Sequence, residues 1–530
     1  MTGPGGALGR STAVMAVGTT LSRVTGFGRL VALAYALGFT RLTDTYNLAN
    51  ITPNIVYELV LGGILSATLV PLFVEQLGDV GAAGRTEADE AASWRAVSAV
   101  MTLVAVAAAV LTVIFVLAAP VVIGLYTVAN DTASADEQQR VATTLLRMFA
   151  PQVLFYAMVS VTAAVLNARR RFAAPMFAPV LNNLVVIAVL LLLPHMTSEL
   201  SLTAVGDRPG ALILLGLGTT AGVAAMAVVQ LPSLRRAGAR LRPVWDPHHP
   251  AVRQVLRLSG WTLGFVATNQ AALWVALALA NGRRGDVAAY QAGLVFFLLP
   301  HGVFAVSVAT ALQPDLAARW SRRDLDAFRH HIALGLRTVA AIVVPAAVGY
   351  LILGRPIVAL ALQHGALSEG SAQTTASVLA WLALGLPAFS LWYFVVRVYQ
   401  SMQNTRTVFG LYLVENAVNI TLAVVLYPSM GVQGLALAYS AAYTIGVAVA
   451  LALLRMRVGG LGRTAVVRSW ARIGVASAAM AACVATVAAI VGPALPRVAL
   501  ATVTGLAVYL LAGRVLGVSE LRSLFALRRS

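Results

Sequence analysis

Fourteen apolar runs, each long enough to cross a membrane, occupy most of this 530-residue chain. A membrane-spanning helix needs about 20 mostly apolar residues, whereas a strand of a membrane barrel needs only about 10. Backbone groups in hydrocarbon must be satisfied within the segment, so runs of this length are expected to be helices. The runs lie at 11–37, 46–74, 97–125, 141–166, 172–193, 210–231, 256–279, 287–312, 332–353, 375–398, 407–427, 432–454, 473–491 and 498–515.

The composition leaves little besides these spans. Hydrophobic residues make up 59% of the chain, charged residues only 11%, and the mean hydropathy is +0.82, which excludes soluble globular classes. The single cysteine, Cys483, cannot pair within the chain or build a thiolate cluster. Because the first run contains Arg23 and Arg29 and has no small-residue cleavage pattern before Asp44, we expect a retained span rather than a signal peptide. The chain is predicted to be an all-α polytopic membrane protein with 14 transmembrane helices.

The basic residues indicate the orientation. All 38 are arginines, and the net charge is +18. When the connections and span ends are assigned alternately to two sides, 27 arginines fall on the side of the N-terminus, seven on the other side and four within spans. The positive-inside rule therefore predicts that both termini are cytoplasmic. The arginine clusters are short and lack interleaved aromatic residues, so we attribute the charge to topology and lipid headgroups and predict no nucleic-acid binding.

The two halves of the chain resemble each other at an offset of 237 residues. Tyr156 then falls on Tyr393, Asn182 falls on Asn419, and Asn167 and Asn404 both begin an Asn-x-Arg-x-x-Phe pattern. Six spans per repeat is an even number, so the copies should be related by a pseudo-twofold axis along the membrane normal, as in a transporter. We expect one six-helix lobe at 1–235, a second at 250–456, two additional C-terminal helices at 468–517 and a cytoplasmic basic tail at 518–530.

Charged groups inside the bilayer are the first candidates for function, because each costs about 2.5 to 3.5 kcal/mol on insertion scales unless it is paired or faces water. The first span carries Arg23 and Arg29, with Gly26 and Gly28 between them as a bending point. Arginine suits phosphate groups because its planar fork offers two parallel donors and remains charged. We expect the pair to contact an anionic ligand; snorkelling to the surface or capping of carbonyls is the alternative.

Three polar residues near the second span complete the predicted substrate-binding set. Asn54 and Glu58 follow Pro53, lie one helical turn apart and can share a face. Glu58 is either a counter-ion of the span 1 arginines, a proton or cation site, or a protonated neutral group. Asp44 either occupies a solvated turn or pairs with those arginines. The predicted set is thus Arg23, Arg29, Asp44, Asn54 and Glu58, with no catalytic residue, no metal and no cofactor.

Charged groups are scarcer in the spans of the second half. Arg397 and Glu415, in the tenth and eleventh spans, are expected to form a structural ion pair. His301 follows Pro300 and is expected to be a polar residue at a helix break, with a proton carrier as the alternative. A cationic interior is therefore predicted mainly for the N-terminal half.

The N-terminal motifs resemble those of the MurJ/MviN family, whose members are lipid II flippases of the multidrug/oligosaccharidyl-lipid/polysaccharide exporter superfamily. The resemblance covers nearly the whole chain. Its motifs are Ser22-Arg23-Val24-Thr25-Gly26-Phe27-Gly28-Arg29, Thr43-Asp44-Thr45-Tyr46, Pro53-Asn54, Ser66-Ala67-Thr68-Leu69-Val70-Pro71, Leu166-Asn167-Ala168-Arg169, Ala178-Pro179-Val180-Leu181-Asn182-Asn183 and Pro300-His301-Gly302-Val303-Phe304-Ala305-Val306.

The resemblance implies movement of lipid II, an undecaprenyl-pyrophosphate-linked precursor of the cell wall, from the inner to the outer leaflet of the bacterial cytoplasmic membrane by alternating access. Arg23, Arg29 and Asp44 match functionally important family positions, and the spans near 473–515 resemble helices that form a groove for the polyprenyl tail. Membrane lipids and cell-wall synthesis proteins are the other candidate partners. The alternatives are an exporter of another polyprenyl-linked oligosaccharide or of drugs, and, less favoured, a membrane enzyme or scaffold.

The chain departs from the family pattern at two places. Many relatives carry an arginine pair soon after the Pro-Asn of the second span, where this chain has Ile55, Val56 and Tyr57. Relatives also often carry an arginine in the eighth span, where residues 293–297 are apolar. The resemblance therefore implies a headgroup site that differs at these positions.

Overall fold

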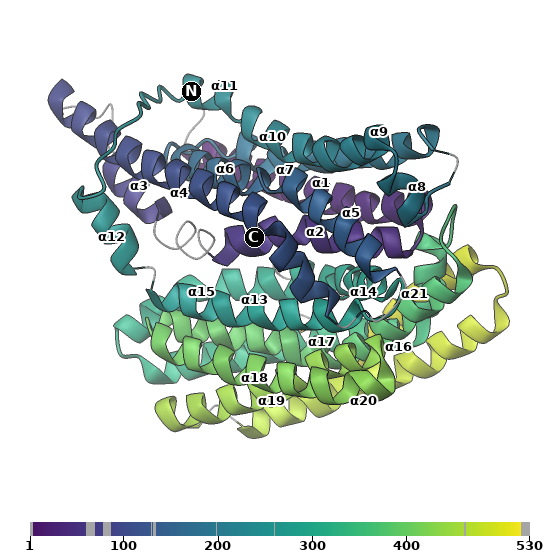
Figure 1. The fold of residues 1–530 in the computed structure, drawn as a ribbon. Helices are drawn as coiled ribbons and strands as arrows, with labels where there is room; N and C mark the ends of the chain where they lie inside the picture. The colour runs from purple at the N-terminus through teal and green to yellow at the C-terminus, as the bar shows by residue number, and fades with distance from the viewer. Residues whose placement is uncertain are drawn as a thin grey trace. The chain divides into compact units, whose positions relative to one another are not determined.

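The computed structural model describes residues 4–59, 69–77, 86–128, 130, 134–197, 199–258, 260–460 and 463–520. Within these ranges the regular structure is helical, without strands (Figure 1). This agrees with the all-α prediction.

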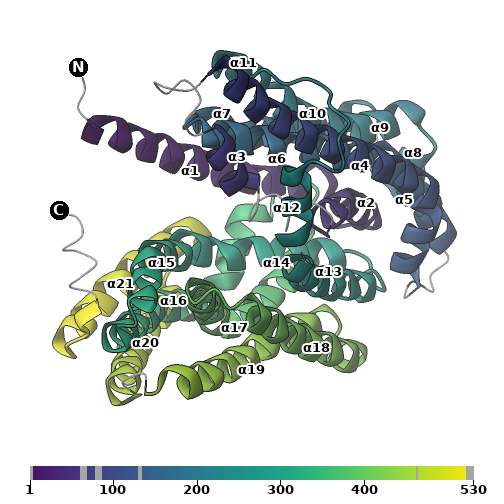
Figure 2. The same ribbon diagram turned by 90° about the vertical axis from the view of Figure 1, so that its left-hand side faces the viewer.

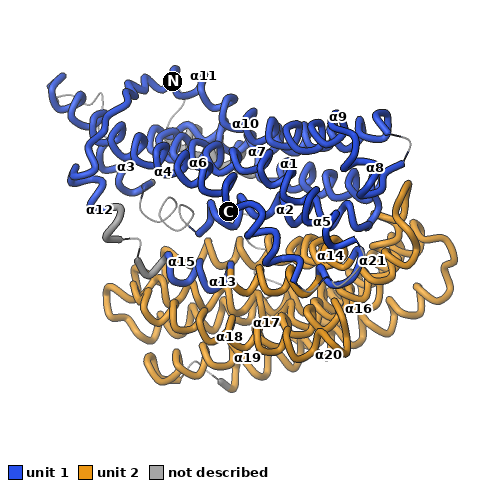
Figure 3. Tube along the Cα trace, viewed as in Figure 1, with its two compact units in different colours: residues 1–270, 281–285 blue, residues 271–280, 286–530 orange. Residues whose placement is uncertain are grey.

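The chain divides into two compact units, coloured separately in Figure 3. Unit 1 comprises residues 1–270 and 281–285. Its helices include α1 Pro4–Leu37, α2 Arg41–Tyr57, α3 Val70–Leu77, α4 Glu87–Thr127, α5 Ala135–Phe149, α6 Gln152–Ala168, α7 Ala173–Leu192, α8 Leu202–Gly206, α9 Pro209–Ile213, α10 Thr219–Val228, α11 Leu231–Arg236, α12 Pro250–Leu258 and the first half of α13 Gly260–Ala280.

Unit 2 comprises residues 271–280 and 286–530. It takes in the second half of α13. Its other helices include α14 Asp286–Pro300, α15 Val306–Ser321, α16 Leu325–Leu362, α17 Glu369–Ser401, α18 Thr405–Met430, α19 Val432–Val458, α20 Arg463–Ile490 and α21 Ala494–Val515.

Twelve helical stretches in the described residues are long and apolar enough to span a membrane. They correspond one by one to the third to fourteenth predicted spans. Neither α1 nor α2 is among the twelve, and the predicted span 46–74 lies partly outside the described residues. The polytopic helical architecture is therefore established, whereas the number fourteen stays a prediction.

Capping side chains extend some helices beyond their apolar runs. Thr86 and Asp89 form a reciprocal capping box, in which each side chain accepts a hydrogen bond from the other's backbone N–H. As a result α4 begins at Glu87, in a polar segment ten residues before the apolar run, and continues for 41 residues.

The core of unit 1 joins α3, α4 and α6 to the connection that follows α11. Leu72 and Phe73 of α3 and Val97 of α4 are buried in the same cluster. The connection is bound along α4, because Ser98 Oγ accepts from Arg242 N at 3.2 Å and Thr102 Oγ1 accepts from Val244 N at 3.0 Å. The connection thus packs as part of unit 1.

In unit 2, α20 and α21 pack against each other and against α16 (Figure 2). The Tyr509 hydroxyl donates to the Ala341 carbonyl at 2.5 Å, and Arg337 pairs with the buried Glu520 at 3.2 Å. The last two helices are therefore fixed to the long helix α16 of the same unit.

Single-turn π-helices interrupt α-helical spans in both units. One covers Leu214–Gly218 between α9 and α10, and the other covers His301–Ala305 directly after Pro300. A π turn inserts an extra residue and is a known cause of helix bending. The second one agrees with the predicted helix break at His301.

Candidate functional site

Arg29 lies in the polar interior of unit 1. The side chain is half-buried in α1, and its charge acts on the hydroxyl groups of Tyr46 in α2 and Tyr156 in α6. Within the described residues its guanidinium donates no hydrogen bond and forms no ion pair. Because a guanidinium carries five N–H donors, Arg29 offers an unused fork for an anion.

Tyrosine hydroxyls of α2 and α6 lie within range of this charge. The rings of Tyr57 and Tyr156 lie 5.5 Å apart, and the Tyr57 hydroxyl is hydrogen-bonded to Ser160 in α6. The Tyr46 hydroxyl lies 3.1 Å from Thr219 Oγ1 in α10. Helices α1, α2, α6 and α10 therefore bring one cation and several hydroxyl groups together, a combination suited to phosphate or sugar oxygens.

Arg23 has different surroundings from Arg29. Its side chain is exposed, and it forms no ion pair in the part of the chain that the structure describes. Nearby, Asn183 of α7 donates to the Ser22 carbonyl at 3.2 Å and to Thr25 Oγ1 at 3.1 Å, which fixes α1 against α7. The structure thus brings Arg29, but not Arg23, to the tyrosines.

Asn54 and Glu58 are half-buried and one turn apart, as their spacing predicts. The Glu58 N–H donates to the Asn54 carbonyl, so the helical turn is intact. The carboxylate of Glu58 acts on the neighbouring Tyr57 hydroxyl. Among the described residues no ion pair joins Glu58 to Arg23 or Arg29.

Asp44 is fully buried near the start of α2, so of its two alternatives the solvated turn is wrong. Its Oδ2 accepts a hydrogen bond from the Gly285 N–H at 2.6 Å. Gly285 has φ of +86°, and a Cβ there would lie 2.7 Å from the Phe39 carbonyl oxygen. Only glycine fits this contact, so the carboxylate fixes a tight turn of unit 1.

A buried polar network that the sequence did not indicate lies in the same region of unit 1. Arg41 Nη1 donates to the Asn281 carbonyl at 2.7 Å, and Gln138 Nε2 donates to Asn281 Oδ1 at 2.8 Å. Asn130 Nδ2 donates to Gln138 Oε1 at 2.6 Å. These four side chains come from connections or helix ends, where no apolar periodicity marks a position as buried. Arg41, at the start of α2, is only 8% exposed.

In unit 2 the expected Arg397–Glu415 ion pair is absent from the described residues. Arg397 instead donates to the Tyr393 hydroxyl at 2.7 Å and to Gln400 Oε1 at 3.1 Å, both within α17. Glu415 is 1% exposed, and neither carboxyl oxygen has a hydrogen-bond partner. The prediction was wrong because partners one turn away on the same helix occupy the guanidinium.

His301 lies in an aromatic cluster of unit 2. Its Nδ1 is 3.1 Å from Ser390 Oγ, and its ring lies 4.5 Å from that of Phe389 and 5.1 Å from that of Tyr393. The side chain is buried at the π turn. These contacts match the interpretation of His301 as a polar residue at a helix break.

Unit 2 also contains an apolar cavity of about 470 Å³ between α16, α17, α19 and α20. Its walls are mostly aliphatic, and Trp470 and Ile473 supply the α20 side. The indole N–H of Trp470 has no hydrogen-bond partner. A cavity with such walls suits a hydrocarbon chain rather than a polar ligand.

The sequence comparisons with known proteins agree on one family. The sequence profile of the family "Lipid II flippase MurJ" matches residues 33–504. The chain is 27% identical over 426 residues to a probable lipid II flippase MurJ of Rhizobium tropici, covering 80% of this chain and 77% of the relative. It is 26% identical over 398 residues to a lipid II flippase MurJ of Burkholderia cenocepacia, covering 73% and 72%.

Solved structures support the same fold. A lipid II flippase MurJ in an inward closed conformation superposes with a TM-score of 0.77 at 20% identity, covering 97% of this chain and 100% of that one. An inward-facing multidrug transporter of the MATE family gives a TM-score of 0.66 at 12% identity, covering 83% and 96%. Because the family profile spans most of the sequence, the chain belongs to the lipid II flippase MurJ family.

Proposed function

We propose that this protein translocates lipid II from the inner to the outer leaflet of the cytoplasmic membrane by alternating access. The observation that carries the proposal is the family match across residues 33–504, which includes α2, the Arg41–Asn281 network and nearly all of unit 2. The protein is a multi-pass transporter rather than an enzyme.

Arg29 is proposed as the main contact for the pyrophosphate of the substrate. Its donors are unused among the described residues, and the Tyr46 and Tyr156 hydroxyls lie within reach of its charge. A pyrophosphate presents several acceptor oxygens, so it accepts from a guanidinium fork and from hydroxyls at once. Asn54 and Glu58, on the helix that carries Tyr57, are proposed to contact the sugar or peptide portion.

Arg23 and Asp44 are proposed to act differently from Arg29. The exposed Arg23 can attract the anionic headgroup before it reaches Arg29, because its charge is on the accessible part of α1. Asp44 acts by holding the 281–285 turn in place rather than by touching an anion. Arg23 is thus proposed to capture the headgroup, and Asp44 is proposed to position the 281–285 turn.

The apolar cavity of unit 2 is proposed to hold part of the polyprenyl tail. Trp470 and Ile473 of α20 belong to its wall, in accord with the tail groove that the resemblance implies for the last two helices. The distribution of arginines supports cytoplasmic termini. Cell-wall synthesis proteins remain candidate partners.

Complementation of a bacterial strain depleted of its own lipid II flippase tests the proposal. We expect the wild-type chain to restore growth and to make lipid II accessible to a degrading enzyme added outside the cells. A chain that is inserted at normal levels but restores neither would contradict the proposal. Export of a different polyprenyl-linked saccharide by that chain would favour the alternative substrate.

A matched pair of variants sharpens the test. Arg29→Ala should strongly reduce outward movement of lipid II, whereas Arg355→Ala should leave it unchanged, because Arg355 is an exposed surface arginine 3.9 Å from Glu369. Normal membrane levels of both variants exclude a folding defect. Full activity of Arg29→Ala would remove the proposed role of this cation.

A further inference from the structure

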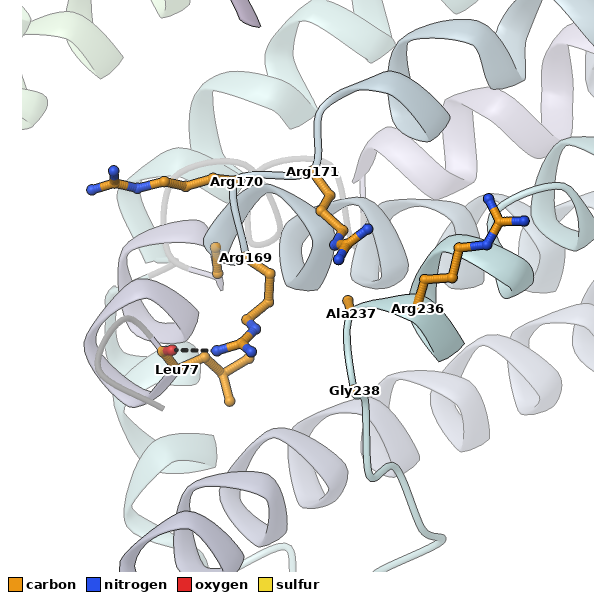
Figure 4. A pocket seen from close by; sticks show the side chains of 8 residues that line it. Leu77, Arg169, Arg170, Arg171, Arg236, Ala237 and Gly238 are labelled. Atoms are coloured by element: carbon orange, nitrogen blue, oxygen red, sulfur yellow. Dashed lines mark hydrogen bonds between the residues drawn. The ribbon is translucent and has the colours of Figure 1, made fainter. Parts of the chain in front are cut away.

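A cationic cavity lies away from Arg29, at an end of unit 1. Its volume is about 410 Å³, and half of the eight residues that line it are arginines, namely Arg169, Arg170, Arg171 and Arg236 (Figure 4). None of the lining residues is acidic. The walls come from the end of α3, the turn between α6 and α7, and the end of α11.

The backbone of the α6–α7 turn directs these arginines. The Arg171 N–H donates to the Leu166 carbonyl at 2.8 Å and the Arg170 N–H donates to the Asn167 carbonyl at 3.0 Å, which is the Schellman pattern of a helix end. Arg170 has φ of +54° at the position that glycine usually occupies. Figure 4 shows Arg169 extending toward Leu77, Arg171 toward Ala237, and Arg170 to the opposite side.

These arginines are not explained by helix capping alone. Basic side chains near a helix C-terminus ordinarily donate to the last carbonyls, and Arg169 does so to the Leu77 carbonyl at 3.4 Å. Arg170, Arg171 and Arg236 are exposed, and they form neither side-chain hydrogen bonds nor ion pairs within the described ranges. Their like charges repel, and a bound anion would offset that repulsion.

We propose that this cavity binds a phosphate group. Guanidinium forks match phosphate oxygens bidentately, and a volume of about 410 Å³ accommodates a phosphate together with part of the group that carries it. The phosphate comes either from an anionic lipid headgroup or from a soluble phosphate compound. The site is separate from Arg29, so it does not depend on the proposed pathway of lipid II.

Binding to the purified full-length protein tests the site with two probes. The soluble probe is inorganic pyrophosphate, titrated against detergent-solubilised protein. The lipid probe is a series of nanodiscs with increasing phosphatidylglycerol in phosphatidylcholine, with retained lipid measured by mass spectrometry. The test variant is Arg171→Gln/Arg236→Gln. The matched control is Arg240→Gln/Arg242→Gln, which removes the same charge from the same side of unit 1 outside the cavity.

We expect the test variant to lose at least about tenfold in affinity for one or both probes, and the control to lose less than about twofold. Loss with pyrophosphate alone identifies a soluble source, and loss with phosphatidylglycerol alone identifies a lipid source. Equal losses in the two variants, or no measurable binding of either probe to the wild type, would overturn the proposal. Unchanged thermal midpoints establish that both variants are folded. The test measures binding of the two probes and does not depend on lipid II transport.

Discussion

Tyr156 and Tyr393, which the predicted repeat matches with each other, are related to arginines in opposite ways in the two units. Tyr156 in unit 1 feels the charge of Arg29 from another helix, α1, and that guanidinium donates no hydrogen bond among the described residues. Tyr393 in unit 2 accepts a hydrogen bond from Arg397, four residues along the same helix. A cation that satisfies itself locally stabilises its helix, whereas one presented from a neighbouring helix keeps its donors for a ligand.

The surroundings of the two tyrosines reinforce this difference. The hydroxyls of Tyr46 and Tyr156 lie within range of the Arg29 charge. Near Tyr393, in contrast, the rings of His301, Phe389, Tyr439 and Tyr443 form a cluster with centroid distances of 4.5 to 6.0 Å. Aromatic contacts of this kind stabilise packing and leave little polar surface. The two tyrosines that the predicted repeat matches thus lie in surroundings of different chemistry.

The largest expected effect is on the rate of lipid II transport when Arg29 and Arg397 are replaced in separate variants. Arg29→Ala should lower the rate of lipid II transport in proteoliposomes on the order of 100-fold, because a charge-assisted hydrogen bond contributes about 1.5 to 3 kcal/mol. Arg397→Ala should lower the rate by less than roughly threefold, since its partners lie on its own helix. Similar losses in both variants would erase the distinction between the units.

The next effect concerns the buried carboxylate of unit 1. Asp44→Ala leaves the Gly285 N–H without its acceptor, so the free energy of unfolding should fall by about 2 to 3 kcal/mol. Asp44→Asn keeps an acceptor oxygen and should lose less. Thermal midpoints in detergent measure both. An unaltered midpoint in the alanine variant would show that the turn does not depend on Asp44.

Replacing Glu415, a buried carboxyl group of unit 2, should stabilise the protein, whereas replacing Asp44 of unit 1 should destabilise it. Glu415→Met removes two oxygens without hydrogen-bond partners and should raise the free energy of unfolding by about 1 to 2 kcal/mol. Glu520→Met is the control, because it removes a buried carboxyl that pairs with Arg337 and should lower the midpoint. A lower midpoint for Glu415→Met would mean that this carboxyl stabilises unit 2.

The smallest effect compares left-handed helix ends in the two units. Arg170 in unit 1 and Gln403 in unit 2 have φ of +54° and +56°. Replacing either with glycine should stabilise the protein by about 1 kcal/mol, since the left-handed conformation costs other residues roughly 1 to 2 kcal/mol. Differential scanning fluorimetry can resolve the two shifts. A destabilising Arg170→Gly alone would indicate that this side chain makes contacts that strengthen the fold.

Much of the fold was predictable because hydrocarbon leaves the backbone few choices. The predicted run 432–454 and α19 Val432–Val458, for example, start at the same residue. Helix ends in polar segments were less predictable. The start of α4 at Glu87 depends on the Thr86–Asp89 capping box. The length of the apolar run does not indicate where such a capping box lies.

The candidate site was predictable where a charge interrupts an apolar span. Arg29 was identified for that reason, and the structure gives it polar neighbours. The contacts of Arg41, Gln138 and Asn281 were not predictable, because they join connections far apart in the sequence. Arg397 was assigned the wrong partner because sequence spacing alone does not rank Tyr393, one turn away, against Glu415 on another helix.

The binding of the 242–244 segment to α4 makes this segment a poor place to insert foreign sequence. Ser98 and Thr102 accept hydrogen bonds from two backbone N–H groups of that segment, so an added residue there would shift the register of both contacts. At Gly460 an added Cβ would meet nothing within 4 Å. A fluorescent reporter or affinity tag should therefore be tolerated after Gly460, whereas the same insertion after Arg242 should reduce the yield of intact transporter.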